Sequence, residues 1–566
     1  MKLEHIQVPL VEGKREASYQ MHRYYARKPS NIVSAYIQAY SQSNETVLDL
    51  FSGSGVTGVE SIRAGRNAHV VDLSPLSAFL SRVTATQIDT SKLEGAFKRI
   101  EKAVKAEIES LYATTCPNTG EQVVPTHFVW AGPKNKPDEA RISKVWYEIG
   151  DEKAERAPTP AEQEQADEAK KRHAEVWIPS TKLSYGDKEF QKSNVLKTVA
   201  ELHCSRALLA LGILRNAIQK ERNVALRECL MLAFTAALQQ TSRLVIVISN
   251  RGSKGGKKGK STRSVEVGSW GRPSYWYPED HFEVNVWNTF ENRFKKVLRG
   301  KEQIVEELQG TRVVDGKARS TDSPTLHLHT ASATHLTMLA DSSIDYIFTD
   351  PPYGGAIQYI ELGTLWTAWM DQEVDATQEI TINPRQGKGA AEFESMIHEA
   401  FCEAHRVLKT GKWMHVTFHS KHFDIWSAIL RAIVQAGFHL EHVLHQPPLR
   451  ASSTALYQPF GSAVGDYYIR FQKREKAAVV PEAMPDEDYE KVVVNSVKTI
   501  LEEAGKPIMF QHILNRLFVL IFEAGALLNT KVDPISILKK RVGHEFELVP
   551  HEVDGEEVGS LWSIRR

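Results

Sequence analysis

The chain has 566 residues, of which 42% are hydrophobic and 25% are charged, as is typical of a large globular protein. Its 70 basic and 70 acidic side chains balance, so binding to nucleic acid would have to rely on local basic patches. The four cysteines are far apart, which speaks against a disulfide framework. No apolar run reaches the roughly 18 residues of a membrane-spanning helix, and the N-terminus has no signal-peptide layout. We therefore expect a cytoplasmic protein without a membrane partner.

The first predicted unit, residues 1–90, alternates strand and helix. Residues 46–51 form an apolar run rich in strand formers, and a glycine turn follows at 52–55. A helix is expected over 56–64, and a second strand ends at Asp72. This order of strand, glycine turn, helix, strand and acid predicts a βαβ unit at the start of a nucleotide-binding sheet.

The glycine turn and the acid that ends the second strand are suited to bind a nucleoside. Gly53 and Gly55 lack a Cβ, so a ligand can lie against the backbone there. The carboxylate of Asp72 can accept hydrogen bonds from two ribose hydroxyls. Gly58 completes a G-x-G-x-x-G pattern, so a dinucleotide is an alternative ligand that other residues have to exclude.

A long insertion, residues 91–324, is predicted to be mostly helical. The segment 137–172 is dense in Glu, Lys, Ala and Pro, which indicates a solvated helix or linker. The segment 195–244 carries apolar residues at helical spacing, which predicts two or three packed helices.

Two features of the insertion could contact DNA. Residues 251–263 are glycine-rich and basic, and we interpret them as a flexible loop that holds phosphates, with a solvated loop as the alternative. ATP binding is disfavoured because the spacing of the glycines does not fit a P-loop. An aromatic group could stack on bases, although packing against the sheet is favoured; its members are Trp270, Tyr275, Trp276, Tyr277 and Trp287.

Residues 325–475 are predicted to complete the sheet. Alternating strands and helices indicate a mostly parallel sheet with helices on both faces. The expected strands are 326–330, 344–348, 413–418, 440–444 and 467–471, and the expected helices are 391–407 and 426–435. A small α+β unit over 484–566 follows, in which helices precede a hairpin, as in a winged-helix domain.

The turn Asp350-Pro351-Pro352-Tyr353 follows the strand 344–348 directly. Two successive prolines remove two backbone donors and stiffen the turn. The Asp350 carboxylate and the Pro351 carbonyl then point out at the carboxyl end of the sheet, where α/β proteins bind ligands. An amine with two hydrogens needs two such acceptors, and the ring of Tyr353 can stack on the base that carries it. A capped structural turn is the blander interpretation, and the upstream glycine loop disfavours it.

These residues resemble the DNA amino-methyltransferases, whose signature motifs F-x-G-x-G and D-P-P-Y are present at 51–55 and 350–353. The segment 24–29 is similar to the one with which that family covers the methionine end of the cofactor. The resemblance implies a Rossmann-like class I methyltransferase sheet, S-adenosylmethionine as cofactor, and no metal. The catalytic residues that it implies are Asp350, Pro351, Pro352 and Tyr353. The implied cofactor-binding residues are Tyr25, Lys28, Pro29, Asp49, Phe51, Ser52, Gly53, Gly55, Thr57, Asp72, Ser332 and Asp350, with Ser332 in the place of the family's usual acid.

The resemblance implies methylation of double-stranded DNA at an exocyclic amine, with adenine N6 favoured. Cytosine N4, a guanine of ribosomal RNA, and a methylase-like binding subunit remain alternatives. The motif order is similar to the subgroup with its target-recognition region in the insertion 91–324. The chain is also similar to methylases of restriction and phage-defence systems, so the unit 484–566 could bind other subunits of such a system.

Overall fold

The computed structural model describes residues 5–116, 120–149, 152–185, 195–248, 265–268, 270, 274–316, 323–420, 422–447, 465–479, 484–523, 532–553 and 556–565. The basic segment 251–263, expected to hold phosphates, lies outside these residues.

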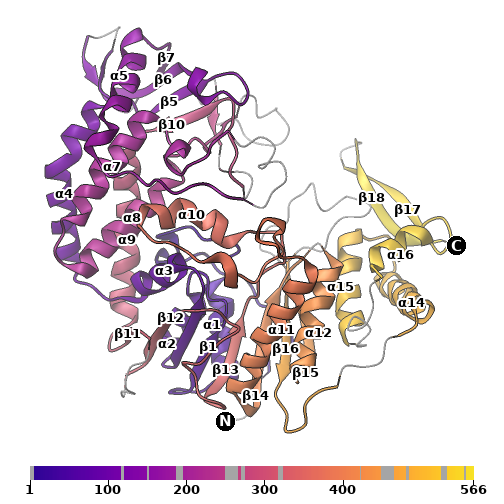
Figure 1. The fold of residues 1–566 in the computed structure, drawn as a ribbon. Coiled ribbons are helices and arrows are strands. Elements are labelled where there is room, and N and C mark those ends of the chain that lie inside the picture. The colour runs from indigo at the N-terminus through magenta and orange to yellow at the C-terminus, as the bar shows by residue number, and fades with distance from the viewer. Residues whose placement is uncertain are drawn as a thin grey trace.

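An eight-stranded sheet forms the centre of the molecule (Figure 1). In spatial order its strands are β11 (Arg312–Asp315), β12 (Thr325–Thr330), β2 (Asn67–Asp72), β1 (Thr46–Asp49), β13 (Ile344–Thr349), β14 (Leu408–Phe418), β16 (Asp466–Gln472) and β15 (His439–Gln446). The strands from β11 to β14 run parallel, and β16 is antiparallel to both of its neighbours. Every strand expected from the sequence is present, and β11 is an addition at the edge.

Helices cover both faces of this sheet. They are α1 (Ser30–Tyr40), α2 (Val56–Arg63), α3 (Pro75–Ala85), α11 (Ala390–Val407) and α12 (Phe423–Gln435). Val47 and Tyr346 are buried in the core that α1 and α2 cover, whereas the next residues in each strand, Leu48 and Ile347, are buried with α11 and α12. Because successive strand residues point to opposite faces, strands buried on both sides are apolar throughout, which is why the sequence reveals them.

The insertion contains a second sheet as well as helices. Its long helices are α4 (Thr90–Ser110), α5 (Pro160–Lys171), α7 (Ser205–Gln219), α8 (Val224–Leu238) and α9 (Val286–Glu307). Its antiparallel sheet has the order β10 (His281–Val284), β5 (His127–Ala131), β6 (Arg141–Ile149) and β7 (Glu152–Arg156).

The short elements of the chain are η1 (Ala17–Gln20), β3 (Thr114–Thr115), β4 (Gln122–Val123), η2 (Pro137–Glu139), η3 (Arg172–Glu175), η4 (Ala200–Leu202), β8 (Val247–Ile248), β9 (Glu266–Val267), η5 (Ala376–Gln378) and η6 (Pro384–Gln386).

The prediction of a helix or linker over 137–172 is wrong for the strands β6 and β7, and it holds only for α5. In β6, Ile142 and the run Val145–Tyr147 are buried, whereas Arg141 and Glu148 are exposed. The charges of this segment lie on a hairpin as well as on α5, and charge density alone does not distinguish a hairpin from a solvated helix. The insertion is therefore a mixed α and β structure.

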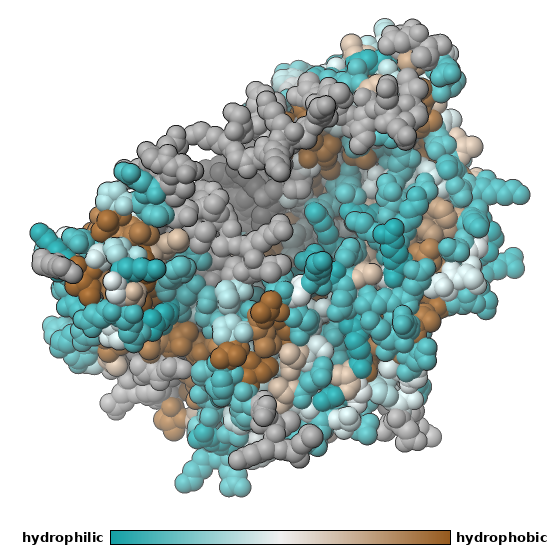
Figure 2. All heavy atoms as spheres, turned by 180° about the vertical axis from the view of Figure 1, so that it is seen from behind, coloured by the Kyte–Doolittle hydropathy of each residue, from teal (hydrophilic) through white to brown (hydrophobic). Residues whose placement is uncertain are grey.

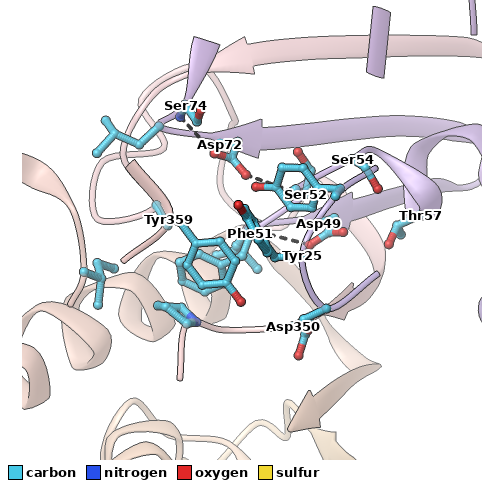
Figure 3. Close-up of a pocket in the computed structure, with 18 of the residues that line it drawn as sticks. Tyr25, Asp49, Phe51, Ser52, Ser54, Thr57, Asp72, Ser74, Asp350 and Tyr359 are labelled. Carbon is cyan, nitrogen blue, oxygen red and sulfur yellow. Dashed lines mark hydrogen bonds between the residues drawn. The ribbon is translucent and has the colours of Figure 1, made fainter. Parts of the chain in front are cut away.

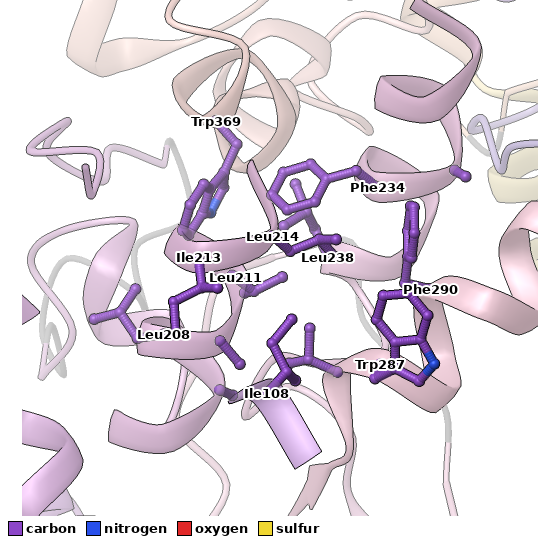
Figure 4. Close-up of a cluster of buried hydrophobic side chains, with 14 of the residues drawn as sticks. Ile108, Leu208, Leu211, Ile213, Leu214, Phe234, Leu238, Trp287, Phe290 and Trp369 are labelled. Atoms are coloured by element: carbon purple, nitrogen blue, oxygen red, sulfur yellow. The ribbon is translucent and has the colours of Figure 1, made fainter. Parts of the chain in front are cut away.

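Helix α10 (Tyr359–Trp369) connects the turn at 350–353 to the insertion. Its Trp369 lies among the apolar side chains of α7 and α8 (Figure 4), with its ring 5.5 Å from that of Phe234. The indole of Trp366 donates a hydrogen bond to the Thr235 carbonyl at 3.1 Å, and Arg215 donates one to the Trp369 carbonyl at 2.8 Å. Helix α10 therefore shares one packed core with the insertion, and α3, which follows β2 of the sheet, belongs to the same core.

The C-terminal unit consists of three helices and a hairpin. These are α14 (Asp486–Ala504), α15 (Phe510–Glu523), α16 (Pro534–Arg541), β17 (Phe546–Val553) and β18 (Glu556–Ile564). Ile508 forms an additional bridge to Trp562 of β18. Phe518 of α15 stacks on Trp426 at 6.0 Å between ring centroids, and it contacts the ring of Tyr467 at the same distance. The apolar core of this unit is thus continuous with that of the main sheet.

The surface seen from behind is mainly hydrophilic, and its hydrophobic residues form separate small groups among the atoms drawn in colour (Figure 2). No helix in the described part of the chain has the length and hydrophobicity needed to cross a membrane.

Candidate active site

A pocket at the carboxyl ends of β1, β2, β12 and β13 joins the glycine loop to the turn at 350–353. Its volume is about 1020 Å³, including space that is open to solvent. The residues of the sequence prediction that line it are Tyr25, Lys28, Asp49, Phe51, Ser52, Gly53, Thr57, Asp72, Ser332, Asp350 and Pro352. Pro29, Gly55, Pro351 and Tyr353 lie beside these residues in the chain but do not line the pocket.

The glycine loop needs glycine at positions 53 and 55 for steric reasons. Gly53 and Gly55 have φ angles of +50° and +77°, in the left-handed region that side chains disfavour. A Cβ at Gly53 would lie 2.7 Å from Cε1 of Tyr24, and a Cβ at Gly55 would overlap the side chain of Ser81. The loop therefore passes close beneath its neighbours and leaves its backbone open toward the pocket.

Asp72 holds the glycine loop in place. One carboxylate oxygen accepts a hydrogen bond from the Gly53 N–H at 2.8 Å, and the other accepts one from the Ser74 N–H at 2.9 Å. Burial raises the pKa of Asp72 to about 6, and these two backbone bonds oppose the shift. Each oxygen of a carboxylate has a further acceptor position. Asp72 can therefore fix the loop and still accept a hydroxyl group of a ligand.

Asp49 connects the glycine loop to the strand that carries the catalytic turn. Its carboxylate accepts hydrogen bonds from the Phe51 N–H at 3.1 Å and from the Thr349 hydroxyl at 2.8 Å. Burial raises its pKa to about 6, against the hydrogen bonds that it accepts. Because Thr349 directly precedes Asp350, this bond fixes the distance between the two motifs.

Asp350 is the centre of a small network of charged and polar groups. The hydroxyl of Tyr353 lies 3.0 and 3.1 Å from the two carboxylate oxygens and can donate its one hydrogen to either. The ammonium of Lys28 lies 3.4 Å from Asp350 and 3.0 Å from Asp466, and it donates to the Tyr353 hydroxyl at 2.9 Å. Asp466, at the start of β16, was not among the predicted site residues.

Burial dominates the electrostatics of this network. It raises the pKa of Asp350 to about 7, against the nearby charge of Lys28. Burial alone would lower the pKa of Lys28, but Asp350 and Asp466 raise it above its usual value. The ring of Tyr353 is buried edge-on against Phe418, 5.3 Å between centroids. The carboxylate at the head of the turn is therefore poised to ionise near neutral pH.

Several residues of the pocket wall were not predicted. Tyr24 and Tyr359 stack on each other with ring centroids 6.5 Å apart, and Arg27 donates to the Ser54 hydroxyl at 2.8 Å. Tyr359 stands between the end of the pocket that holds Asp72 and the end that holds Asp350 (Figure 3). Tyr24 and Arg27 were detectable, because they belong to the segment 24–29. Tyr359 starts α10 and belongs to no recognisable motif.

The mixed sheet, with one antiparallel strand between two others at its edge, is compatible with a Rossmann-like methyltransferase. Residues 5–114 match a protein family described as DNA methylase, and this match supports an N6-adenine or N4-cytosine DNA methyltransferase family for the chain. DNA methyltransferases of this family generally use S-adenosylmethionine. The matched segment contains the glycine loop and Asp72, whereas the turn at 350–353 lies outside it. A search of curated proteins found no match.

Proposed function

We propose that this protein is an S-adenosylmethionine-dependent DNA methyltransferase that modifies the exocyclic amine of a flipped base, with adenine N6 favoured over cytosine N4. The observation that carries the proposal is the single pocket in which the Asp72-anchored glycine loop faces Asp350. A nucleoside cofactor and a base with an exposed amine can meet there.

The residues of the pocket fit this cofactor. Gly53 and the Asp72 carboxylate, which has remaining acceptor capacity, suit a ribose, and Phe51 and Ser332 line the same pocket. When bound, S-adenosylmethionine supplies an electrophilic methyl group. The other residues that we propose to hold it are Tyr25, Lys28, Pro29, Asp49, Ser52, Gly55 and Thr57.

The chain's own residues then act on the base. A base inside a duplex cannot be reached, so it has to be flipped into the pocket. The Asp350 carboxylate and the Pro351 carbonyl accept the two N–H groups of the amine, and Tyr353 stacks on the base after its hydroxyl leaves Asp350. Asp350 also stabilises the positive charge that develops on the amine. Much of the acceleration comes from holding the two reactants in position.

A transfer assay with tritiated S-adenosylmethionine and duplex DNA tests this proposal. We expect label on DNA with the wild type and with Asp138→Ala, whose side chain is 94% exposed, but none with Asp350→Ala. Chromatography of the digested nucleosides distinguishes N6-methyladenine from N4-methylcytosine. Label that persists in Asp350→Ala would refute the catalytic assignment.

The second candidate is a methylase-like subunit that binds DNA within a restriction or phage-defence complex and whose catalysis is dispensable. Its supporting observation is the unit 484–566, which extends the molecule beyond the sheet. DNA binding by the wild type without any label would favour this candidate.

A further inference from the structure

A second cleft lies where the N-terminal segment meets the insertion. It is lined by α9, by the end of α8 and by strands of the smaller sheet, and its volume is about 1780 Å³, including space that is open to solvent. Arg23 and Trp270 line this cleft. Arg23 directly precedes Tyr24 of the candidate active site, and the Trp270 ring lies 6.3 Å from that of Tyr25. The cleft therefore adjoins the pocket that holds Asp350.

Basic side chains predominate in this cleft. It is lined by the cations Arg23, Arg293, Lys295, Lys296 and Arg299 and by two acids, Glu148 and Glu291. Glu291 is paired with Lys295 at 2.9 Å. Among the residues that the structure describes, no carboxylate forms an ion pair with any of the other four cations. A charge-balanced protein thus concentrates positive charge at one place.

These cations are close enough to affect one another. Burial, and then the charges of Arg293, Arg23 and Arg299, lower the pKa of Lys296. Burial and the charge of Arg23 likewise lower the pKa of Arg293, whose guanidinium donates to the Gln240 side chain at 2.9 Å. Like charges held close together cost free energy, and a bound anion would relieve that cost.

The arrangement along α9 fits a chain of phosphates better than a single anion. Arg293, Lys296 and Arg299 follow one another at intervals of three residues, so they occupy one side of the helix and span roughly 9 Å along its axis. Successive nucleotides of one DNA strand rise by about 3.4 Å. The cleft also contains side-chain amides, a group that can recognise base edges by hydrogen bonding. They belong to Gln239, Gln240, Asn288 and Asn292.

We infer that this cleft binds the sugar-phosphate backbone of the DNA whose base enters the pocket at Asp350. The identity of the nucleic acid as DNA rests on the proposed function, whereas the location of the phosphate contacts rests on the cleft. Trp270, at the boundary between cleft and pocket, would lie beside the nucleotide next to the flipped base.

The double variant Lys296→Ala, Arg299→Ala tests this inference, because both side chains are exposed and the fold should tolerate their loss. The matched control is Lys98→Ala, Lys102→Ala, two exposed lysines on α4. Affinity for a fluorescent DNA duplex is measured by anisotropy at several salt concentrations. We expect the first variant to bind about 10–100-fold more weakly, with the slope of log K against log salt reduced by about 2, and the control to bind as the wild type does.

Methyl transfer measured on the same variants separates this inference from the proposed function. We expect the KM for DNA to rise in the cleft variant while kcat at saturating DNA stays the same. If the wild type methylates DNA but the cleft variant keeps its affinity and salt slope, the cleft assignment is overturned. If the variant loses affinity while the wild type transfers no methyl group, the cleft assignment stands and the proposed function fails. Binding of inorganic phosphate alone, without binding of the duplex, would also overturn the cleft assignment.

Discussion

At the scale of single residues, the ionisation of Asp350 should set the pH dependence of the reaction. Only the carboxylate form carries the negative charge that stabilises the developing positive charge on the amine, and burial raises the pKa of Asp350 to about 7. Below that pH the ionised fraction falls about tenfold per unit. We therefore expect kcat/KM to level off about one pH unit above the pKa and to fall on the acid side. Methyl transfer measured over this range, with circular dichroism to verify folding, checks this; a flat profile across the range would contradict it.

Lys28 should act as a positioning residue for Asp350. Its charge opposes the rise in the pKa of Asp350, so Lys28→Met should raise that pKa and move the acid limb of the rate profile to higher pH, by about one unit. Lys28→Arg retains the charge and should leave the limb close to its original position. A lower rate in Lys28→Met with an unmoved limb would mean that Lys28 has only a packing role.

Asp72 should control cofactor affinity. Asp72→Ala removes the acceptors for a ribose and also the anchor of the Gly53 N–H, so we expect S-adenosylmethionine to bind about 10–100-fold more weakly, as when hydrogen bonds to a charged group are lost. Calorimetric titration measures this, and an unchanged melting profile of the free protein shows that the fold is intact. Affinity equal to that of the wild type would remove Asp72 from the proposed site.

At the scale of elements, Gly58 explains how closely α2 lies on the sheet. A Cβ at this position would be 2.6 Å from Cδ1 of Leu326 and 2.7 Å from Cγ1 of Val70. Gly58→Ala should therefore destabilise the protein by about 1–3 kcal/mol through overpacking. In Gly363→Ala of α10 the new Cβ meets no atom within 4 Å, and this control should be neutral or stabilising. Thermal melting of the two variants compares them, and equal effects would argue against the close packing.

The glycine at position 58 also shows what a motif can and cannot predict. Gly58 completes a G-x-G-x-x-G pattern, so the sequence alone allowed a dinucleotide as the ligand. In the structure, the close packing of Gly58 on β2 and β12 explains why glycine is needed there, whichever ligand binds. The inner strands β1 and β13 were predictable because each is a buried apolar run bounded by a turn, whereas the partly exposed edge strand β11 was not. The strands β6 and β7 were not, because charged residues are interspersed with their apolar residues.

The candidate site was predictable only where its residues lie in contiguous motifs. The glycine loop, Asp72 and Asp350 each follow a strand directly, so their meeting at one sheet edge follows from the fold. Asp466 and Tyr359 reach the same place through the pairing of β16 with β14 and through the path of α10. Neither the pairing nor the path has a local signal in the sequence.

At the scale of the whole molecule, the C-terminal unit should be part of the cooperative fold. Phe518→Ala removes the ring that packs on Trp426 and Tyr467, and we expect a loss of about 3–5 kcal/mol that lowers the Tm of the entire chain. Leu520→Ala, on the exposed side of the same helix, should have little effect. Scanning calorimetry distinguishes the outcomes, because an independent unit would produce a separate transition that alone shifts in Phe518→Ala.

Helix α10 limits how this protein can be engineered or recombined. Its first residue, Tyr359, forms part of the pocket wall, and its last, Trp369, is embedded among helices α7 and α8. A chimera that exchanged residues 91–324 alone would leave Trp366 and Trp369 facing a foreign surface. An exchange of the insertion would therefore have to include residues 359–370, although more than thirty residues of the host's own sheet separate the two segments in the chain.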